Sequence, residues 1–114
     1  MTSMRCLLLL GFGLLCACTD QIPEHIELAP TGAEVEFVYE PPSPNAYTMV
    51  GTVRGVAAGA DAEVAQEAAR NDLRNKAAAL GATLVTIDEN LGEPVLLLGK
   101  TKVTLVGRAF KAVD

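Results

Sequence analysis

The sequence is poor in the residue types on which most catalytic and metal sites depend. Its 114 residues include no tryptophan, one histidine and three cysteines, and only 4% are aromatic. Positive charge is also scarce, because 9 Lys and Arg stand against 14 Asp and Glu, for a net charge of −5. A nucleic-acid-binding domain needs clustered bases that face phosphates, so the composition argues against that class. The length allows one small domain.

The chain also lacks an apolar run long enough to cross a bilayer. Its longest N-terminal run, residues 7–17, has 11 residues, whereas a spanning helix needs about 20. Arg5 is the one charge before this run, and the run ends in small residues. A basic start, a short apolar run and a small residue before a break are typical of a secretory signal. We therefore expect residues 1–17 to be a signal peptide.

The end of this run, Leu15-Cys16-Ala17-Cys18, resembles the bacterial lipobox. The resemblance implies cleavage between Ala17 and Cys18 and attachment of a diacylglycerol to the Cys18 thiol. Cys16 fits the pattern less well, because Leu15 would occupy its −1 position. The alternative is an ordinary secretory signal that happens to end in Cys. Two or more acyl chains make a stable membrane anchor.

The residues after Cys18 predict where the anchor lies. In enteric bacteria an Asp directly after the lipidated Cys retains a lipoprotein in the inner membrane, and here that residue is Thr19, with Asp20 one position later. We expect an outer-membrane protein that faces the periplasm. Residues 18–33 are polar, contain Pro23 and Pro30 and show no sustained period, so we expect a flexible lipidated tether. Beyond Cys18 the sequence has no thiol, and the mature chain is expected to form no disulfide.

Residues 34–112 predict a single α+β domain of order ββαββ, a small sheet with one helix packed on one face. Acidic and apolar residues alternate over 34–40, which predicts an edge strand with one wet face. The β-branched and apolar residues 47–54 predict a second strand. Residues 55–60 predict a flexible turn after it.

The second half of the sheet is expected to follow the helix. Residues 83–88 predict a third strand, and residues 89–94, with Asn, Gly and Pro, predict a turn. Two further strand candidates, 95–98 and 102–110, are expected to form a hairpin around Gly99-Lys100-Thr101.

The helix is predicted over residues 62–80. Asp61 is suited to the N-cap, and Gly81 stands where a left-handed C-cap belongs. At 100° per residue the apolar side chains fall on one face, which is expected to pack on the sheet: Ala62, Ala65, Ala69, Leu73, Ala77 and Leu80.

The opposite side of this helix is polar and supplies the candidate partner-facing residues. They are Arg70, Asn71, Arg74 and Asn75. The spacings of Glu67 with Arg70 and of Asp72 with Lys76 favour ion pairs within the helix. The sequence predicts either a docking surface or a solvated face here.

Other short motifs do not meet the requirements of a ligand site. In a P-loop ending at Gly99-Lys100-Thr101 the first Gly would stand at position 94, which is Pro, so no nucleotide site is expected. The acids between 88 and 93 lack the spacing of a calcium loop, and His25 has no partner ligand nearby, so no metal site or other cofactor is expected. Gly51, Gly55 and Gly59 recur every four residues, a helix-packing pattern, but they lie in a predicted strand and turn and are assigned no packing role.

The sequence also gives no constellation for catalysis. Beyond Cys18 the sole Ser is Ser43, in a Pro-rich loop, and the sole His lies 18 residues before it. A carboxylate pair such as Asp72 with Asp88 has no sequence feature that places it in a cleft with separated pKa values. We expect a non-enzymatic protein.

Three stretches together resemble a known lipoprotein family. They are residues 71–82, Asn-Asp-Leu-Arg-Asn-Lys-Ala-Ala-Ala-Leu-Gly-Ala, residues 106–111, Val-Gly-Arg-Ala-Phe-Lys, and residues 50–55, Val-Gly-Thr-Val-Arg-Gly. The pattern is similar to small bacterial lipoproteins of the YjeI type and, more distantly, to the RcsF lipoproteins that sense envelope stress for the Rcs phosphorelay. The resemblance implies cysteines at two positions that here hold Tyr47 and Ala112. If it holds, these two residues lie near each other, with Cα atoms within about 8 Å.

The function expected from these features is that of a lipid-anchored cell-envelope protein whose domain binds an envelope protein or supports the envelope. The expected partners are the membrane, through the anchor, and a protein, with no nucleic acid or nucleotide. Two alternatives stay open: an envelope-stress sensor that acts on a phosphorelay through protein contact, and a small-ligand or metal-binding module.

Overall fold

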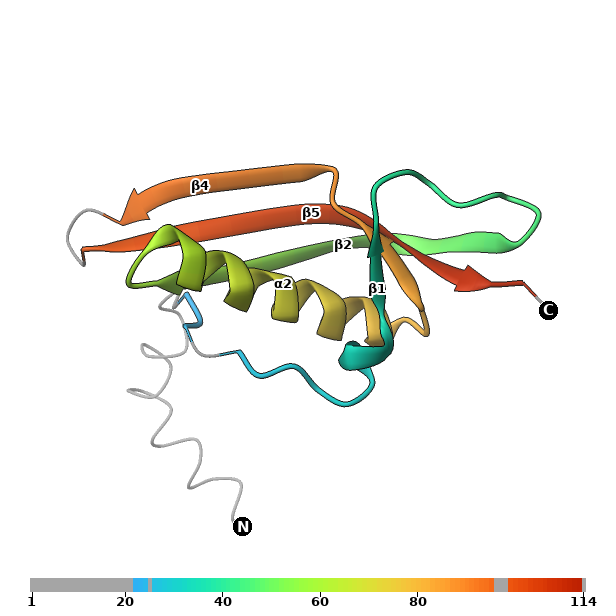
Figure 1. The fold of residues 1–114 in the computed structure, drawn as a ribbon, viewed down its shortest axis with the longest axis horizontal. Helices are drawn as coiled ribbons and strands as arrows, with labels where there is room; N and C mark the ends of the chain where they lie inside the picture. The colour runs from blue at the N-terminus through green and yellow to red at the C-terminus, as the bar shows by residue number, and fades with distance from the viewer. Residues whose placement is uncertain (1–21, 25, 96–98, 114) are drawn as a thin grey trace, which may run out of the picture.

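The computed structural model describes residues 22–24, 26–95 and 99–113, and its elements form an α+β fold (Figure 1). In chain order they are the 3-10 helix η1 (Gly32–Glu34), β1 (Glu36–Val38), β2 (Tyr47–Gly59), α2 (Ala62–Ala79), β3 (Leu84–Thr86), β4 (Glu89–Val95) and β5 (Lys100–Ala112). The strands form one mixed sheet, and α2 lies across one of its faces. The predicted class, with a single helix between two groups of strands, is therefore correct.

Strand β5 is the centre of the sheet. One of its edges pairs antiparallel with β2, and the other pairs antiparallel with β3 and then with β4. Strand β1 pairs parallel with β3 and forms one end of the strand order β1-β3-β5-β2, so the edge position predicted for residues 34–40 is confirmed. In the β2–β5 ladder Tyr47 is the direct partner of Ala112, which confirms that these two residues are neighbours.

The first strand after the Pro-rich loop is longer than predicted. We expected a turn over residues 55–60, but β2 continues to Gly59. A Cβ atom at Gly55 would lie 2.4 Å from the carbonyl oxygen of Ala69, and one at Gly59 would lie 2.6 Å from the nitrogen of Ala65. Because alternate strand residues share a face, glycines four apart line the same side of β2, and here α2 rests on them. The Gly51, Gly55 and Gly59 repeat is therefore a strand-to-helix packing motif, and the interpretation that it has no packing role was wrong.

The turn predicted over residues 89–94 is also wrong, since these residues form most of β4. Strand β5 extends beyond β3, and β4 pairs with the extra length, from Lys100 to Val106. Pro94 is tolerated because, within the described residues, no strand pairs with the outer edge of β4. The hairpin turn includes Gly99, whose φ is +65°. Residues 96–98, part of a predicted strand, lie outside the described residues.

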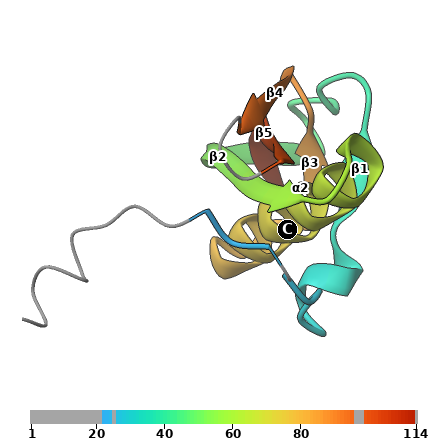
Figure 2. The same cartoon turned by 90° about the vertical axis from the view of Figure 1, so that its left-hand side faces the viewer.

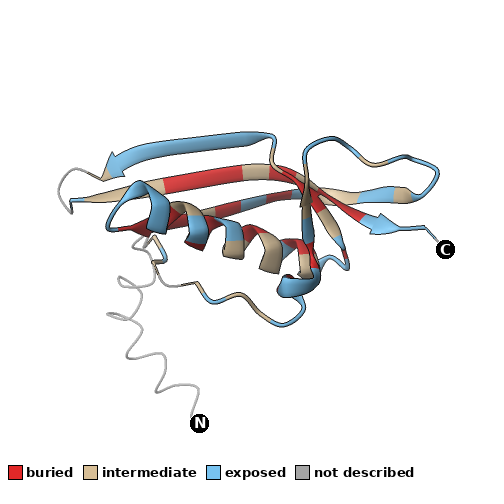
Figure 3. Ribbon diagram, in the orientation of Figure 1, coloured by how far each residue is buried: buried red, intermediate tan, exposed pale blue. Residues whose placement is uncertain are grey.

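Helix α2 begins and ends as predicted. The Asp61 carboxylate accepts a hydrogen bond from the Val64 N–H at 2.9 Å, and Gly81, just after the C-cap, has a φ of +83°. Four of the six predicted inward residues are buried, but Ala62 is exposed and Leu80 is 44% exposed because both stand at the helix ends. The buried face also includes Ala68. Figure 3 shows the buried residues along the inner face of α2 and the middle of β2 and β5.

The outer edge of β2 is covered by side chains of α2 and by the N-terminal segment. Asp72 accepts a hydrogen bond from the Val56 N–H at 2.9 Å, and Lys76 donates to the Arg54 carbonyl at 2.9 Å. One step further along, the Ala58 N–H donates to the Pro23 carbonyl at 2.8 Å. The Lys76 Nζ and Asp72 Oδ2 atoms are 3.0 Å apart, so these residues form the ion pair within the helix that their spacing favoured.

The described N-terminal residues 22–24 and 26–35 lie against α2 and are here called the strap, which is extended up to η1 (Figure 2). We expected residues 18–33 to be a flexible tether, but residues 26–33 are bound to the domain through hydrogen bonds with α2. The prediction was based on the polar composition and two prolines of this segment, which are typical of a linker. It was wrong because the residues that order the segment lie more than 40 positions away in sequence. The folded part of the chain therefore begins well before residue 34.

Candidate functional site

The four candidate partner-facing residues lie on the outer side of α2, but three of them bind the protein's own strap. Asn71 donates to the Ile26 carbonyl at 2.9 Å. Asn75 both accepts from the Ala29 N–H and donates to the Glu27 carbonyl, each at 2.9 Å. The polar side chains that predicted a docking surface thus bind the backbone of a segment of the same chain.

Arg74 fixes the last part of the strap. Its Nε donates to the Val35 carbonyl at 3.0 Å, and its terminal nitrogen donates to the Ala33 carbonyl at 3.1 Å. Val35 is 1% exposed and belongs to the core, so Arg74 ties the entry of β1 to the helix.

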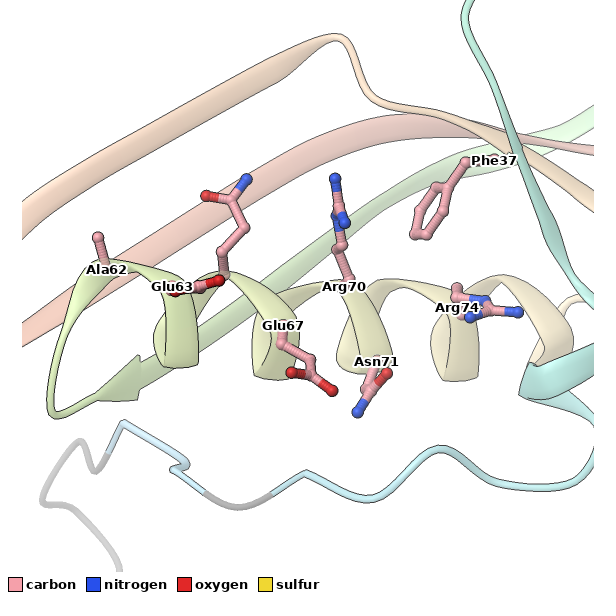
Figure 4. Close-up of a pocket in the computed structure, with 8 residues that line it drawn as sticks. Phe37, Ala62, Glu63, Glu67, Arg70, Asn71 and Arg74 are labelled. Carbon is pink, nitrogen blue, oxygen red and sulfur yellow. The ribbon is translucent and has the colours of Figure 1, made fainter.

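Arg70, one turn before Arg74, is exposed and stacks on an aromatic ring. Its guanidinium carbon lies 5.6 Å from the centre of the Phe37 ring, and that of Arg74 lies 5.5 Å from the same centre. These distances are within the range of cation–π attraction. Figure 4 shows Phe37, on β1, approaching the two arginines of α2.

Phe37 and the outer face of α2 enclose an open groove of about 650 Å³. Glu63, Gln66 and Glu67 line the half that is nearer the start of α2, and Arg70 and Arg74 line the half beneath Phe37. The groove is therefore negative at one end and positive at the other. Its complete lining is Phe37, Ala62, Glu63, Gln66, Glu67, Arg70, Asn71 and Arg74.

A smaller hollow of about 180 Å³ lies between α2 and the strap. Glu24 and Ile26 line it from the strap, and Val64, Glu67, Ala68 and Asn71 line it from the helix. Glu67 and Asn71 line both hollows, so the helix separates an open groove from the bound strap.

The predicted ion pair of Glu67 with Arg70 is not among the pairs formed by the residues that the structure describes. Arg70 lies over the Phe37 ring instead and lines the groove. Such an arrangement suits a carboxylate or carbonyl group of a ligand, because guanidinium donors in a fixed plane pair with these acceptors.

Away from the groove, the Asp88 and Asp72 carboxylates each have a structural partner. Arg108 donates to Asp88 through Nε at 2.9 Å and through a terminal nitrogen at 3.1 Å. These hydrogen bonds lower the pKa of Asp88 below its usual value, against a smaller opposing effect of burial. Asp72 instead bonds Val56 and Lys76, so the two carboxylates considered as a pair have separate partners.

Neither a metal cluster nor a membrane-spanning helix emerges from the described part of the chain. Within residues 22–24, 26–95 and 99–113, no three His, Cys, Asp or Glu side chains gather as a metal site, and no helix is long and apolar enough to cross a membrane. Ala17 and Cys18, the predicted cleavage and lipid sites, and His25 lie outside the described residues.

Sequence reasoning missed Phe37 as part of the site. The alternating pattern over residues 34–40 did place Val35, Phe37 and Tyr39 on one side of the strand, yet Val35 is buried, Phe37 is half-buried and Tyr39 is fully exposed. Only the parallel pairing of β1 with β3 sets Phe37 over α2.

A scan against protein-family models and a search of curated proteins gave no match to this chain.

Proposed function

We propose that this chain is a non-enzymatic, lipid-anchored protein of the bacterial cell envelope. Cys18 carries the acyl chains in the outer membrane, and the α+β domain faces the periplasm. The support is the sequence Leu15-Cys16-Ala17-Cys18 behind a short apolar run and a single Arg. The scarcity of Ser, His and Cys in the mature chain supports a binding rather than a catalytic role.

We further propose that the domain binds a protein partner in the groove between Phe37 and α2. The observation that carries this proposal is Arg70, which is exposed, lies over the Phe37 ring with its guanidinium carbon 5.6 Å from the ring centre, and lines an open groove. A planar cation beside an aromatic ring, with carboxylates one to two turns away, is suited to an extended peptide segment with an acidic residue at one end and a basic residue at the other. Arginine and aromatic residues also dominate the energetics of protein interfaces.

The anchor is tested by metabolic labelling with palmitate and by membrane fractionation. Wild-type protein is expected to incorporate the label and to sediment with outer membranes, whereas Cys18→Ala is expected to lose the label and to appear in the soluble periplasmic fraction. Cys16→Ala is the matched control and is expected to behave like the wild type. An unlabelled wild-type protein would contradict the anchor.

The groove is tested by photo-crosslinking in cells from position 66 on its floor. A crosslinked band is expected that disappears in Arg70→Glu and persists in Arg54→Glu, an exposed arginine on β2 that does not line the groove. A band that survives Arg70→Glu, or no band at all from position 66, would contradict partner binding in this groove.

A further inference from the structure

The strap joins the folded domain at a defined point, and this point is only five positions after the proposed lipid site in the sequence. The Pro23 carbonyl accepts the Ala58 N–H at 2.8 Å, and the neighbouring Glu24 forms an ion pair with Lys100. Both contacts are at the end of the sheet where β2 finishes and β5 begins. From there the strap follows α2 to the other end of the helix, as Figures 1 and 2 show.

Chain length then limits how far this end of the domain can move from the membrane. Pro23 is five positions after Cys18, and at about 3.3–3.6 Å for each position this stretch reaches at most about 18 Å. If residues 22–31 left α2, Gly32 would be the first residue still bound to the domain, and the 14 positions from Cys18 to Gly32 would reach about 50 Å. The maximum distance between Cys18 and the folded domain is thus about three times shorter when the strap is docked than when it is released.

We infer that the strap is a releasable leash that sets the height and orientation of the domain above the membrane. This inference rests on the proposed lipidation of Cys18. With the strap docked, the turn between β2 and α2 faces the lipid and the Pro-rich loop that precedes β2 points away. With the strap released, the domain loses this orientation and its groove reaches much farther into the periplasm.

The contacts that hold the strap are suited to local opening. Its backbone is bound mainly by the side chains of Asn71, Arg74 and Asn75 at or near the surface, and its apolar contribution between residues 22 and 31 comes from half-buried residues such as Ile26. Segments with few buried apolar contacts and exposed hydrogen bonds open at a lower free energy than the core. Residues 22–31 of the strap can therefore detach while Val35, β2, β5 and α2 stay folded.

The docked orientation is tested with the full lipidated protein in vesicles that contain a headgroup-labelled acceptor lipid. A donor dye is placed on Ala60→Cys, in the turn between β2 and α2, or on Asn45→Cys, in the Pro-rich loop; both residues are exposed. The 13 residues of β2 lie between these sites and span about 40 Å. Energy transfer is expected to be strong from position 60 and weak from position 45.

Release is tested with Gly32→Ala. A Cβ at Gly32 would lie 2.2 Å from the Asn75 side-chain oxygen and would displace the amide that holds Ala29 and Glu27. Transfer from positions 60 and 45 is expected to become similar, and the Ala29 amide is expected to exchange hydrogen about tenfold faster. Ile26→Asp, a change within the strap itself, is expected to do the same, while Gly92→Ala, where a Cβ meets nothing within 4 Å, is expected to leave both readouts unchanged.

The outcomes separate this inference from the anchor itself. Failure of the wild type to incorporate palmitate and bind vesicles overturns the anchor and the leash together. Lipidated wild-type protein with equal transfer from both positions overturns the leash alone. So does an unchanged transfer pattern in both Gly32→Ala and Ile26→Asp, provided that slow exchange of α2 and β5 amides shows an intact domain.

Discussion

At the residue scale, glycine decides how closely α2 lies on the sheet. Gly55 and Gly59 face the backbone of the helix, and the helix presents mainly alanines in return. A side chain at either glycine would meet main-chain atoms, which have no rotamer by which to move away. The short distance between helix and sheet is therefore fixed by the absence of side chains on β2.

Gly55→Ala is expected to destabilise the domain by about 1–3 kcal/mol, the usual effect of overpacking a closed core. The new methyl group would lie 2.4 Å from the Ala69 oxygen and 2.8 Å from the Leu73 nitrogen. Thermal unfolding followed by circular dichroism should show a lower melting temperature, by about 4–8 °C for each kcal/mol. Gly92→Ala is the matched control, and an equal loss in both variants would contradict this account.

The Asp88–Arg108 pair is expected to make stability depend on pH. Because the Arg108 hydrogen bonds lower the pKa of Asp88 in the folded protein, this carboxylate stabilises the fold at pH values above its unfolded pKa of about 3.9. The contribution is lost as the pH falls through the lower folded pKa. Urea unfolding from pH 7 to pH 2 should show Asp88→Asn less stable than the wild type at pH 7, with the gap closing in acid. A gap that stays constant over this range would disprove the linkage.

At the scale of elements, the sequence predicted those features that are governed by neighbouring residues. Helix α2 is recognisable because Asp61, the alanine stripe and Gly81 are all local signals, and the edge strand β1 is recognisable from its alternation. Strand β4 and the strap were not predicted, since Asn, Gly and Pro favour turns locally. Strand β4 is ordered by pairing with the long strand β5, and the strap is ordered by the polar face of α2. Neither partner can be recognised from the sequence of the segment itself.

Tyr47→Cys combined with Ala112→Cys is expected to form a disulfide. The Val113 N–H donates to the Ala46 carbonyl at 2.8 Å, so the adjacent Tyr47 and Ala112 form a non-hydrogen-bonded pair of the ladder. Such pairs have Cα atoms about 4.5 Å apart, which a disulfide can bridge. In a Cys18→Ala background, oxidation should raise the stability of the double variant by about 2–4 kcal/mol, reversibly with dithiothreitol.

Each single cysteine variant serves as the control for that measurement. The stability of either single variant, as a monomer, is expected to be the same with and without dithiothreitol. Persistent free thiols in the oxidised double variant, measured by alkylation and mass spectrometry, would show that the β2–β5 register is not the one described.

At the scale of the whole molecule, one layer of alanines, valines and a few larger side chains forms the only core within the described residues. Leu73, on α2, is fully buried in its centre and lies against Gly55 of β2. Leu73→Ala is expected to lower the free energy of unfolding by about 2–5 kcal/mol. Leu91→Ala on β4, where the side chain is 55% exposed, should change it by no more than about 0.5 kcal/mol.

Circular dichroism and tyrosine fluorescence should report the same transition for Leu73→Ala, since the loss acts on a core shared by α2, β2, β3 and β5. Two separated transitions would show that the sheet and α2 unfold independently and would contradict a single core.

The candidate site is a property of the whole molecule for the same reason. The four polar residues of α2 were predicted as a group, and the structure divides them: Asn71, Arg74 and Asn75 bind the strap, while Arg70 remains at the groove. That division depends on a segment about 45 residues earlier and on Phe37 from another strand. Helical periodicity identifies an outward face, but it does not indicate what covers that face.

The bare outer edge of β4 has a consequence for crowding. If the proposed anchor holds copies on one membrane, they meet at high local concentration, and an unpaired strand edge is a template for pairing with a second chain. Here the edge carries Pro94, which has no N–H to offer, and Glu89 and Glu93, whose charges repel a second copy of themselves. Closely spaced copies of this protein should therefore remain separate and not polymerise through β4.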